Sequence, residues 1–278
     1  MSLKLMYITN RVEIATIAEN SGVDRIFVDM EYVGKSDRQG GMDTVQSRHT
    51  IEDVRRIRAA LKKAQLLVRV NPIHEASSEH MGSEREINAA IEAGADIIML
   101  PYFKTVEEVA RFLRIVDRRV RVCLLVETPE AVDHIDEILA LPGVDEVLIG
   151  LNDLSLGYGK KFMFELLADG TVEFLCEKFA KANIPYGFGG IASMGKGLLP
   201  SEYVIKEHYR LGSNCAILSR SFCDVRKLQD MSQAEEIFKN GMIAIRNYEI
   251  AVVNERDSYE MNHRKVQEIV QQIVGDNQ

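Results

Sequence analysis

The sequence lacks long hydrophobic runs and clusters of basic residues. No apolar run approaches the roughly 20 residues that span a bilayer, and residues 1–10 lack the length and apolar core of a signal peptide. No run of five Lys or Arg residues occurs, and 34 basic against 42 acidic residues leave a net charge of −8. These absences argue against a membrane protein and against binding to nucleic acids or anionic lipid surfaces.

Cysteine is scarce and unpaired in the sequence. The four cysteines, Cys123, Cys176, Cys215 and Cys223, form no CxxC pair. Cys123 and Cys215 lie inside apolar runs, where free cysteine behaves as a small core residue. This usage predicts a reducing, cytoplasmic environment.

Eight short apolar runs organise the chain. They lie at residues 3–8, 25–30, 65–70, 96–100, 122–127, 146–150, 185–188 and 214–219. Longer amphipathic segments separate them, which is typical of buried parallel strands that alternate with helices. The length of 278 residues fits two domains of about 150 residues or one barrel of about 250. The count of eight favours a (β/α)8 TIM barrel over an open, doubly wound sheet, which usually has fewer strands.

Helix-start signals follow several of these runs. Capping-box patterns begin at Thr50, Ser83 and Thr105, with an acidic residue three positions later. Thr128 precedes Pro129, which is typical of a cap followed by proline in the first helical turn.

Two segments exceed a minimal barrel. Residues 34–48 form a long polar stretch after the second strand, on the side where barrel enzymes place their chemistry. Residues 232–253 form an apolar helix, and a second apolar stripe comprises Val266, Ile269, Val270, Ile273 and Val274. One of these helices completes the barrel, and the other needs the barrel flank or another subunit as a partner. We therefore predict a barrel domain over residues 1–255, a helical extension over 256–278, and a homo-oligomer.

Glu127 and Asp153 are the strongest candidates for chemistry. Glu127 ends the fifth predicted strand, Asp153 follows the sixth, and the two strands are neighbours, so both carboxylates lie at the C-terminal end of the barrel. Two converging carboxylates repel unless a cation or a proton lies between them. Since neither Cys nor His is near, oxygen ligands predict Mg²⁺ or Mn²⁺. The alternative is that both are solvated helix caps.

Arg69 ends a strand that should be buried, so its guanidinium needs an anion. That anion is either a substrate or one of two nearby acids, Asp29 and Glu31. A tight turn after the sixth strand also offers backbone N–H groups to a substrate carboxylate, those of Leu151, Asn152 and Asp153.

Several of these segments together resemble one known family. The segments LLVETPEA at 124–131 and VLIGLNDLS at 147–155 resemble the metal-binding motifs of the HpcH/HpaI aldolase and citrate lyase beta-subunit family. VRVNP at 68–72 is similar to its substrate-arginine segment, and GADIIMLP at 94–101 and DME at 29–31 are similar to its fourth and second strands.

The resemblance implies a specific chemistry. It implies a (β/α)8 barrel with a divalent metal, Mg²⁺ or Mn²⁺, on Glu127 and Asp153. It further implies an aldolase or lyase that makes or breaks a carbon–carbon bond next to a 2-keto acid, through an enolate that the metal and Arg69 stabilise. A citrate-lyase-type acyl-CoA lyase is one alternative. A barrel that binds metal and keto acid without turnover is another.

One position departs from the family pattern. Tyr32 stands where the aldolase branch has a histidine and the citrate lyase branch an acidic residue. The group that moves protons is therefore open among Tyr32, His49 and Glu31. Two further histidines, His74 and His80, fall in the loop after the third strand, on the same face.

Overall fold

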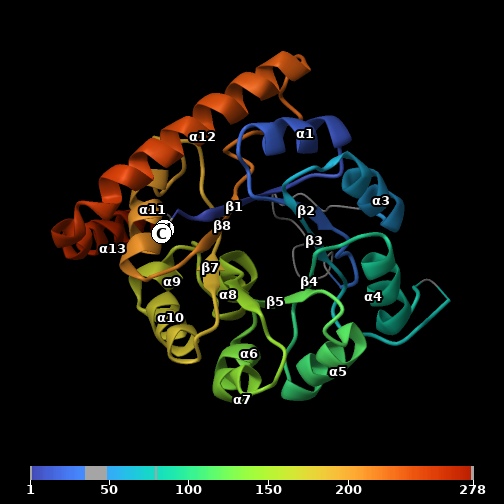
Figure 1. The fold of residues 1–278 in the computed structure, drawn as a ribbon. Coiled ribbons are helices and arrows are strands. Elements are labelled where there is room, and N and C mark those ends of the chain that lie inside the picture. The colour runs from blue at the N-terminus through green and yellow to red at the C-terminus, as the bar shows by residue number, and fades with distance from the viewer. Residues whose placement is uncertain (1, 35–48, 79, 277–278) are drawn as a thin grey trace.

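The computed structural model describes residues 2–34, 49–78 and 80–276. Within them, eight parallel strands close into one barrel in sequence order (Figure 1). The strands are β1 (Lys4–Ile8), β2 (Arg25–Asp29), β3 (Gln65–Arg69), β4 (Ile97–Leu100), β5 (Arg121–Val126), β6 (Glu146–Ile149), β7 (Tyr186–Phe188) and β8 (Cys215–Leu218). The predicted (β/α)8 barrel is confirmed, and the doubly wound alternative is wrong.

Helices surround the barrel (Figure 1). They are α1 (Val12–Asn20), α3 (Ile51–Ala60), α4 (Ser83–Glu92), α5 (Val106–Val116), α6 (Pro129–Asp133), α7 (Ile135–Leu139), α8 (Leu151–Gly157), α9 (Glu165–Ala168), α10 (Thr171–Lys181), α11 (Ser201–Arg210), α12 (Met231–Val253), the 3₁₀ turn η1 (Arg256–Ser258) and α13 (Tyr259–Asp276). Among the described residues, no helix is both long enough and apolar enough to cross a membrane.

Strand residues alternate between the barrel interior and the helix layer. In β2, Ile26 and Val28 pack in the large cluster beneath the helices, whereas Phe27 points into the barrel. The middle of the barrel is filled by Met6, Phe27, Leu67, Ile97, Met99, Cys123, Leu125, Leu148 and Cys215. The interior is therefore a packed core, and its two ends carry the polar side chains.

A buried ion pair closes the N-terminal end of the barrel. The Arg25 side chain is fully buried, and its Nη1 and Nη2 donate to Glu146 Oε1 and Oε2 at 2.5 and 2.8 Å. Gln65 accepts a third hydrogen bond from Arg25 Nε. Each residue lies two positions before an interior residue of its strand, so strand periodicity places all three inside.

Most of the predicted helix starts are confirmed. Thr50 and Thr105 form capping boxes at α3 and α5, and Thr128 caps α6 with Pro129 following it. The capping box predicted at Ser83 is wrong, because α4 begins at Ser83 itself and has no side-chain cap. The Ser83 hydroxyl instead accepts from the His74 backbone N–H, which closes the loop before the helix.

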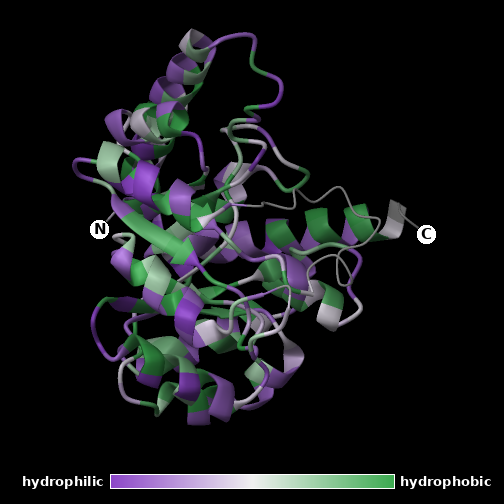
Figure 2. Ribbon diagram, turned by 90° about the vertical axis from the view of Figure 1, so that its right-hand side faces the viewer, coloured by the Kyte–Doolittle hydropathy of each residue, from purple (hydrophilic) through white to green (hydrophobic). Residues whose placement is uncertain are grey.

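The two C-terminal helices both pack on the barrel. α12 lies against α1 and α11 and takes the eighth position of the helical ring (Figure 1). α13 packs against α11 and α9, where it buries Val266 and Val270. In Figure 2, α13 carries both hydrophobic and hydrophilic residues, and its end lies on the opposite side of the molecule from the N-terminus. The partner of the second helix is thus the barrel flank.

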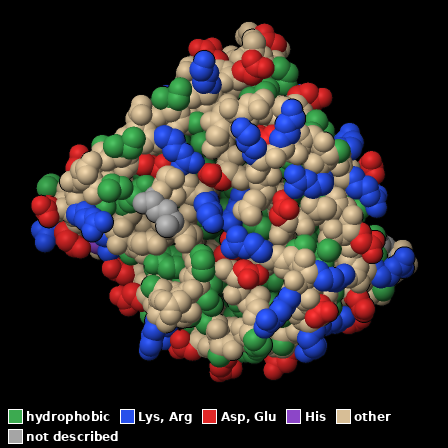
Figure 3. Space-filling model, viewed as in Figure 1, with side chains coloured by type: hydrophobic (Ala, Val, Ile, Leu, Met, Phe, Trp, Pro, Cys, Tyr) green, Lys and Arg blue, Asp and Glu red, His purple; other side chains and the backbone are tan. Residues whose placement is uncertain are grey.

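The positions of the cysteines and of the charged side chains match the expectations from the composition. All four cysteines are free and buried, which confirms that Cys123 and Cys215 are core residues. On the face seen in Figure 3, basic and acidic side chains are interspersed. The predicted loop over residues 34–48 lies outside the described residues, except for Gly34.

Candidate active site

Acidic and basic side chains gather at the C-terminal ends of β2, β3 and β5. Asp29 and Arg69 are register partners at the ends of β2 and β3. Each lies two residues beyond an interior residue, Phe27 or Leu67, so each points into the mouth of the barrel. Glu127 follows Leu125 in β5 with the same spacing. The strand pattern therefore brings these three side chains to one end of the barrel.

Arg69 is held by two acids. Its Nε and Nη2 donate to the Asp29 carboxylate, both at 2.8 Å, and its Nη1 lies 3.3 Å from Glu31 Oε2. Burial opposes its charge, but Asp29 and Glu31 together raise its pKa, so Arg69 stays protonated. A guanidinium has five N–H groups. Asp29 engages two of them in hydrogen bonds, and Nη1 contacts Glu31 as an ion pair.

Glu127 is a buried carboxylate at the end of β5, and 3 % of its surface is exposed. Its Oε1 accepts from the backbone N–H of Tyr102 at 3.0 Å, which links it to the loop after β4. The next residue, Thr128, donates its hydroxyl hydrogen to the Phe103 carbonyl at 2.7 Å. These two bonds fix the direction in which Glu127 points.

Other acids surround Glu127. Burial raises the pKa of Glu127 well above its ordinary value, and the charges of Glu31 and Asp153 raise it further, whereas Arg69 lowers it. Asp153 lies in the first turn of α8 and is 8 % exposed. Glu127 and Asp153 therefore share one electrostatic environment at the barrel mouth.

Gly150 makes room for the Glu127 side chain. A Cβ at position 150 would lie 2.6 Å from Glu127 Oε2 and 2.7 Å from Glu127 Cβ. Such contacts are shorter than van der Waals distances, so only glycine lets the carboxylate lie against the end of β6. The same residue is the N-cap of α8, which carries Asp153. Gly150 is thus where the segment that carries Asp153 contacts the Glu127 side chain.

The donor set fits a divalent cation with few protein ligands. Among residues 2–34, 49–78 and 80–276, four acids, Asp29, Glu31, Glu127 and Asp153, accompany Arg69 at this end of the barrel. No group of three or more His, Cys, Asp or Glu residues is placed to hold a metal ion in the described part of the chain. Mg²⁺ commonly binds through one or two carboxylates and completes its shell with water or substrate.

The three candidates for proton transfer lie in different settings. Glu31 is fully buried and engaged with Arg69. His49 Nδ1 accepts the backbone N–H of Asp29 at 2.9 Å, so that nitrogen carries no hydrogen and is occupied. Tyr32 is 44 % exposed, which leaves it the most accessible of the three.

Sequence reasoning missed the group that supports Tyr32. Asn71, two residues beyond Arg69, accepts the backbone N–H of Tyr32 at 2.9 Å and donates to Glu86 at 2.6 Å. The Tyr32 hydroxyl lies 3.2 Å from His80 Nδ1. The inward position of Asn71 could be read from strand spacing, but the contacts of Glu86 and His80 depend on how the loop after β3 folds.

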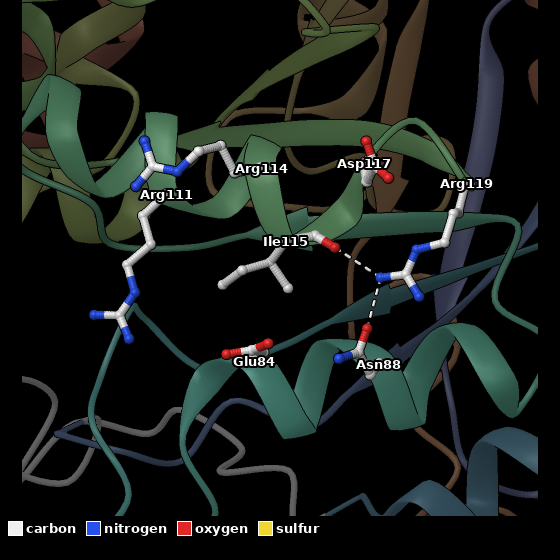
Figure 4. Close-up of a pocket in the computed structure, with 7 residues that line it drawn as sticks. All are labelled: Glu84, Asn88, Arg111, Arg114, Ile115, Asp117 and Arg119. Carbon is white, nitrogen blue, oxygen red and sulfur yellow. Dashed lines mark hydrogen bonds between the residues drawn. The ribbon is translucent and has the colours of Figure 1, made fainter.

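A surface hollow on the outside of the barrel lies apart from the residues at the barrel mouth. One of about 530 Å³ lies between α4 and α5 and is lined by several arginines (Figure 4). Arg111 pairs with Glu75, and Arg119 donates to Asn88 Oδ1 and to the Ile115 carbonyl. These arginines are engaged with protein groups on the outside of the barrel. This hollow is therefore separate from Arg69 and the acids at the barrel mouth.

A family profile matches this barrel. The profile of HpcH/HpaI aldolase/citrate lyase matches residues 5–165, more than half of the chain. The chain belongs to the HpcH/HpaI aldolase/citrate lyase family, as its motifs predicted. This membership supports a lyase-type enzyme that acts on small molecules. No curated protein sequence matches the chain significantly.

Solved structures share the fold at low sequence identity. An HpcH/HpaI aldolase/citrate lyase family protein from Burkholderia cenocepacia J2315 is 16 % identical with a TM-score of 0.59, covering 78 % of this chain and 88 % of its own. The HpcH/HpaI aldolase from Desulfitobacterium hafniense DCB-2 is 17 % identical with a TM-score of 0.57, covering 78 % and 86 %. The citrate synthase SbnG is 16 % identical with a TM-score of 0.59, covering 88 % and 94 %.

Proposed function

We propose that this protein is a divalent-metal-dependent carbon–carbon lyase of the aldolase type, acting on a 2-keto acid. The observation that carries the proposal is the buried Glu127 carboxylate, whose pKa is raised by burial and by the charges of Glu31 and Asp153. Buried like charges persist when a cation or a proton compensates them. Mg²⁺ or Mn²⁺ on Glu127 and Asp153 would supply that charge.

Several groups around Glu127 would each have a separate role in the reaction. A bound divalent cation would act as a Lewis acid toward the keto and carboxylate oxygens of the substrate. Arg69 N–H groups that Asp29 does not engage would donate to the keto oxygen as negative charge develops on it. The backbone N–H groups of Leu151 and Asn152, in the first turn of α8, would receive the substrate carboxylate.

Cleavage of a 4-hydroxy-2-keto acid then requires two proton movements. A base takes the proton of the 4-hydroxyl group, and the bond between carbons 3 and 4 breaks to release an aldehyde. The bonding electron pair remains on the keto acid half as an enolate, whose oxygen Arg69 stabilises. Protonation of carbon 3 completes the 2-keto acid product.

The test is release of pyruvate from a panel of 4-hydroxy-2-keto acids with Mg²⁺, with Mn²⁺ and with a chelator. We expect cleavage that the chelator abolishes. Glu127→Gln should weaken Mn²⁺ binding in calorimetry by about 100-fold or more, because even groups that only orient a metal ligand contribute about 10–100-fold. The matched control is Glu130→Gln, since Glu130 is half-exposed and pairs with Lys104 at 2.8 Å.

Three results would contradict the proposal. If Glu127→Gln and the natural protein bound Mn²⁺ with equal affinity, Glu127 would not be a metal ligand. Cleavage of 3-hydroxyacyl-CoA esters, with no release of pyruvate from any keto acid, would instead identify an acyl-CoA lyase. Tight oxalate binding that needs Mg²⁺, without cleavage of any compound, would identify a binding protein.

A further inference from the structure

A tyrosine and a histidine from the loops after β2 and β3 meet at the C-terminal end of the barrel. Tyr32 lies three residues beyond the end of β2, next to Glu31. Its hydroxyl lies 3.2 Å from Nδ1 of His80 in the loop after β3. The two rings pack edge to face, with centroids 5.3 Å apart. A hydrogen bond and a ring contact thus join the same pair.

The backbone of Tyr32 is fixed independently of its ring. Asn71 Oδ1 accepts the backbone N–H groups of both Tyr32 and Val33 at 2.9 Å. Asn71 is itself held by Glu86 of α4, through a 2.6 Å bond from Nδ2. Asn71 and Glu86 are 1 % and 6 % exposed, so this support is part of the core.

The loop that carries His80 is also closed by hydrogen bonds. The backbone N–H of His80 donates to Ser77 Oγ at 3.1 Å, and the N–H of Ser77 donates to the His80 carbonyl at 2.9 Å. Both ring nitrogens of the neighbouring His74 form hydrogen bonds with backbone carbonyls, those of Pro72 and Met81. His74 therefore stabilises the loop, and His80 presents its Nδ1 to Tyr32.

We propose that Tyr32 and His80 form the proton relay of the lyase reaction. The relay rests on the proposed function and would carry out the proton transfer that the sequence left open among Tyr32, His49 and Glu31. Tyr32 Oη takes the proton of the substrate 4-hydroxyl while its own proton passes to His80 Nδ1, and the carbon–carbon bond breaks. The reverse transfer delivers a proton to carbon 3 of the enolate, so both residues return to their starting state.

The surroundings favour a neutral phenol at rest. Burial raises the pKa of Tyr32, and the charge of Glu86 raises it further. Among the described residues, the titratable groups near the pair are Glu31, which precedes Tyr32, Glu86 of α4, whose charge acts on Tyr32, and His74, whose ring centroid lies 6.5 Å from that of His80. Tyr32 thus keeps its proton until His80 accepts it. Tyr32 is the catalytic residue, and His80 is a positioning residue that acts through it.

The test compares Tyr32→Phe, His80→Gln, His80→Asn and the double variant Tyr32→Phe/His80→Gln. We expect each single variant to lose about 100-fold or more in kcat for aldol cleavage, with little change in KM. His80→Asn can place an amide oxygen near the Nδ1 position but cannot take up a proton at neutral pH. We therefore expect it to lose the acid limb of the pH profile as His80→Gln does.

The double variant should be no slower than the slower single variant, because the two residues act as one unit. Oxalate binding in the presence of Mg²⁺, measured by calorimetry, should be unchanged in all variants. The control is His134→Gln, an exposed histidine between α6 and α7.

Separate outcomes overturn separate claims. If the natural protein cleaves a keto acid and His80→Asn keeps both its rate and its acid limb, the relay is wrong and the lyase stands. Additive losses in the double variant would also overturn the relay. If the natural protein binds no Mg²⁺ and cleaves no compound, the lyase and the relay fall together.

Discussion

At position 150, a glycine lets the Glu127 carboxylate lie against the end of β6. Strand spacing alone predicts that Glu127 and Asp153 leave neighbouring strands at the same end of the barrel. It does not predict that the space for one of them depends on a missing side chain in the other's segment. The geometry of the acidic cluster can therefore be tested without changing any acidic residue.

We expect Gly150→Ala to weaken Mn²⁺ binding by about tenfold or more, because the added methyl group collides with Glu127 Oε2 and Cβ and displaces the carboxylate. Isothermal titration calorimetry measures this affinity. The control is Gly275→Ala in α13, where an added Cβ meets no atom within 4 Å. An unchanged affinity in Gly150→Ala would show that the carboxylate position is not needed for the metal.

At the scale of single elements, eight apolar runs were enough to predict the barrel, because each buried strand needs a continuous apolar segment. Local cap chemistry located the starts of α3, α5 and α6. The prediction failed at Ser83, where a tertiary contact with His74 takes the hydroxyl. The Arg25–Glu146 pair was also missed, because periodicity places each side chain inside but cannot say which residues meet across the barrel.

The partners of Arg69 were only half predictable for a similar reason. Its position at the end of a buried strand requires an anion, and the sequence offered both Asp29 and Glu31. The structure shows contacts with both. The contact between Tyr32 and His80 could not be predicted, since it depends on the path of an irregular loop that no periodic pattern describes.

α11 carries a histidine that makes stability depend on pH. His208 is fully buried and stacks on Phe188 with ring centroids 3.7 Å apart. Burial lowers the pKa of His208 to about 3. Below the ordinary histidine pKa of about 6.5, the unfolded chain binds a proton that the folded chain does not. This difference in bound protons lowers stability as the pH falls from about 6.5 toward 3.

We expect His208→Phe to remove a slope of up to about 1.4 kcal/mol per pH unit from the free energy of unfolding between about pH 4 and 6. Phenylalanine keeps the stacking on Phe188 and cannot be protonated. Urea unfolding at several pH values measures the slope. His134→Gln, at an exposed position, should leave it unchanged. Equal slopes in His208→Phe and the natural protein would contradict this account.

At the scale of the whole molecule, α12 presents apolar side chains to solvent. Ile243 and Ile250, seven residues apart on one helix face, are 51 % and 66 % exposed, and Met261 at the start of α13 is 69 % exposed. Such a patch is typical of an interface. The predicted homo-oligomer thus remains a prediction, and this patch is where we expect its contact.

We expect Ile250→Glu to lower the molar mass in light scattering from that of an oligomer to that of one 31.4 kDa chain. A charge in the centre of an apolar interface is costly to desolvate. Lys239→Glu, on the same helix, is the control. Substitution is a cleaner test than removing α13, which would expose the α11 surface that Val266 and Val270 cover. A single-chain mass for the natural protein would contradict the expected oligomer.

The buried Arg25–Glu146 pair limits how ligands can enter and leave the barrel. Packed side chains and the buried Arg25–Glu146 pair fill the described barrel below its C-terminal end, so a ligand bound at Arg69 would enter and leave from that end. In the proposed cleavage, the keto acid half would lie against Arg69 and the aldehyde half nearer the exposed Tyr32, so the aldehyde would leave first. Reagents for the synthetic direction would then have to arrive in the opposite sequence.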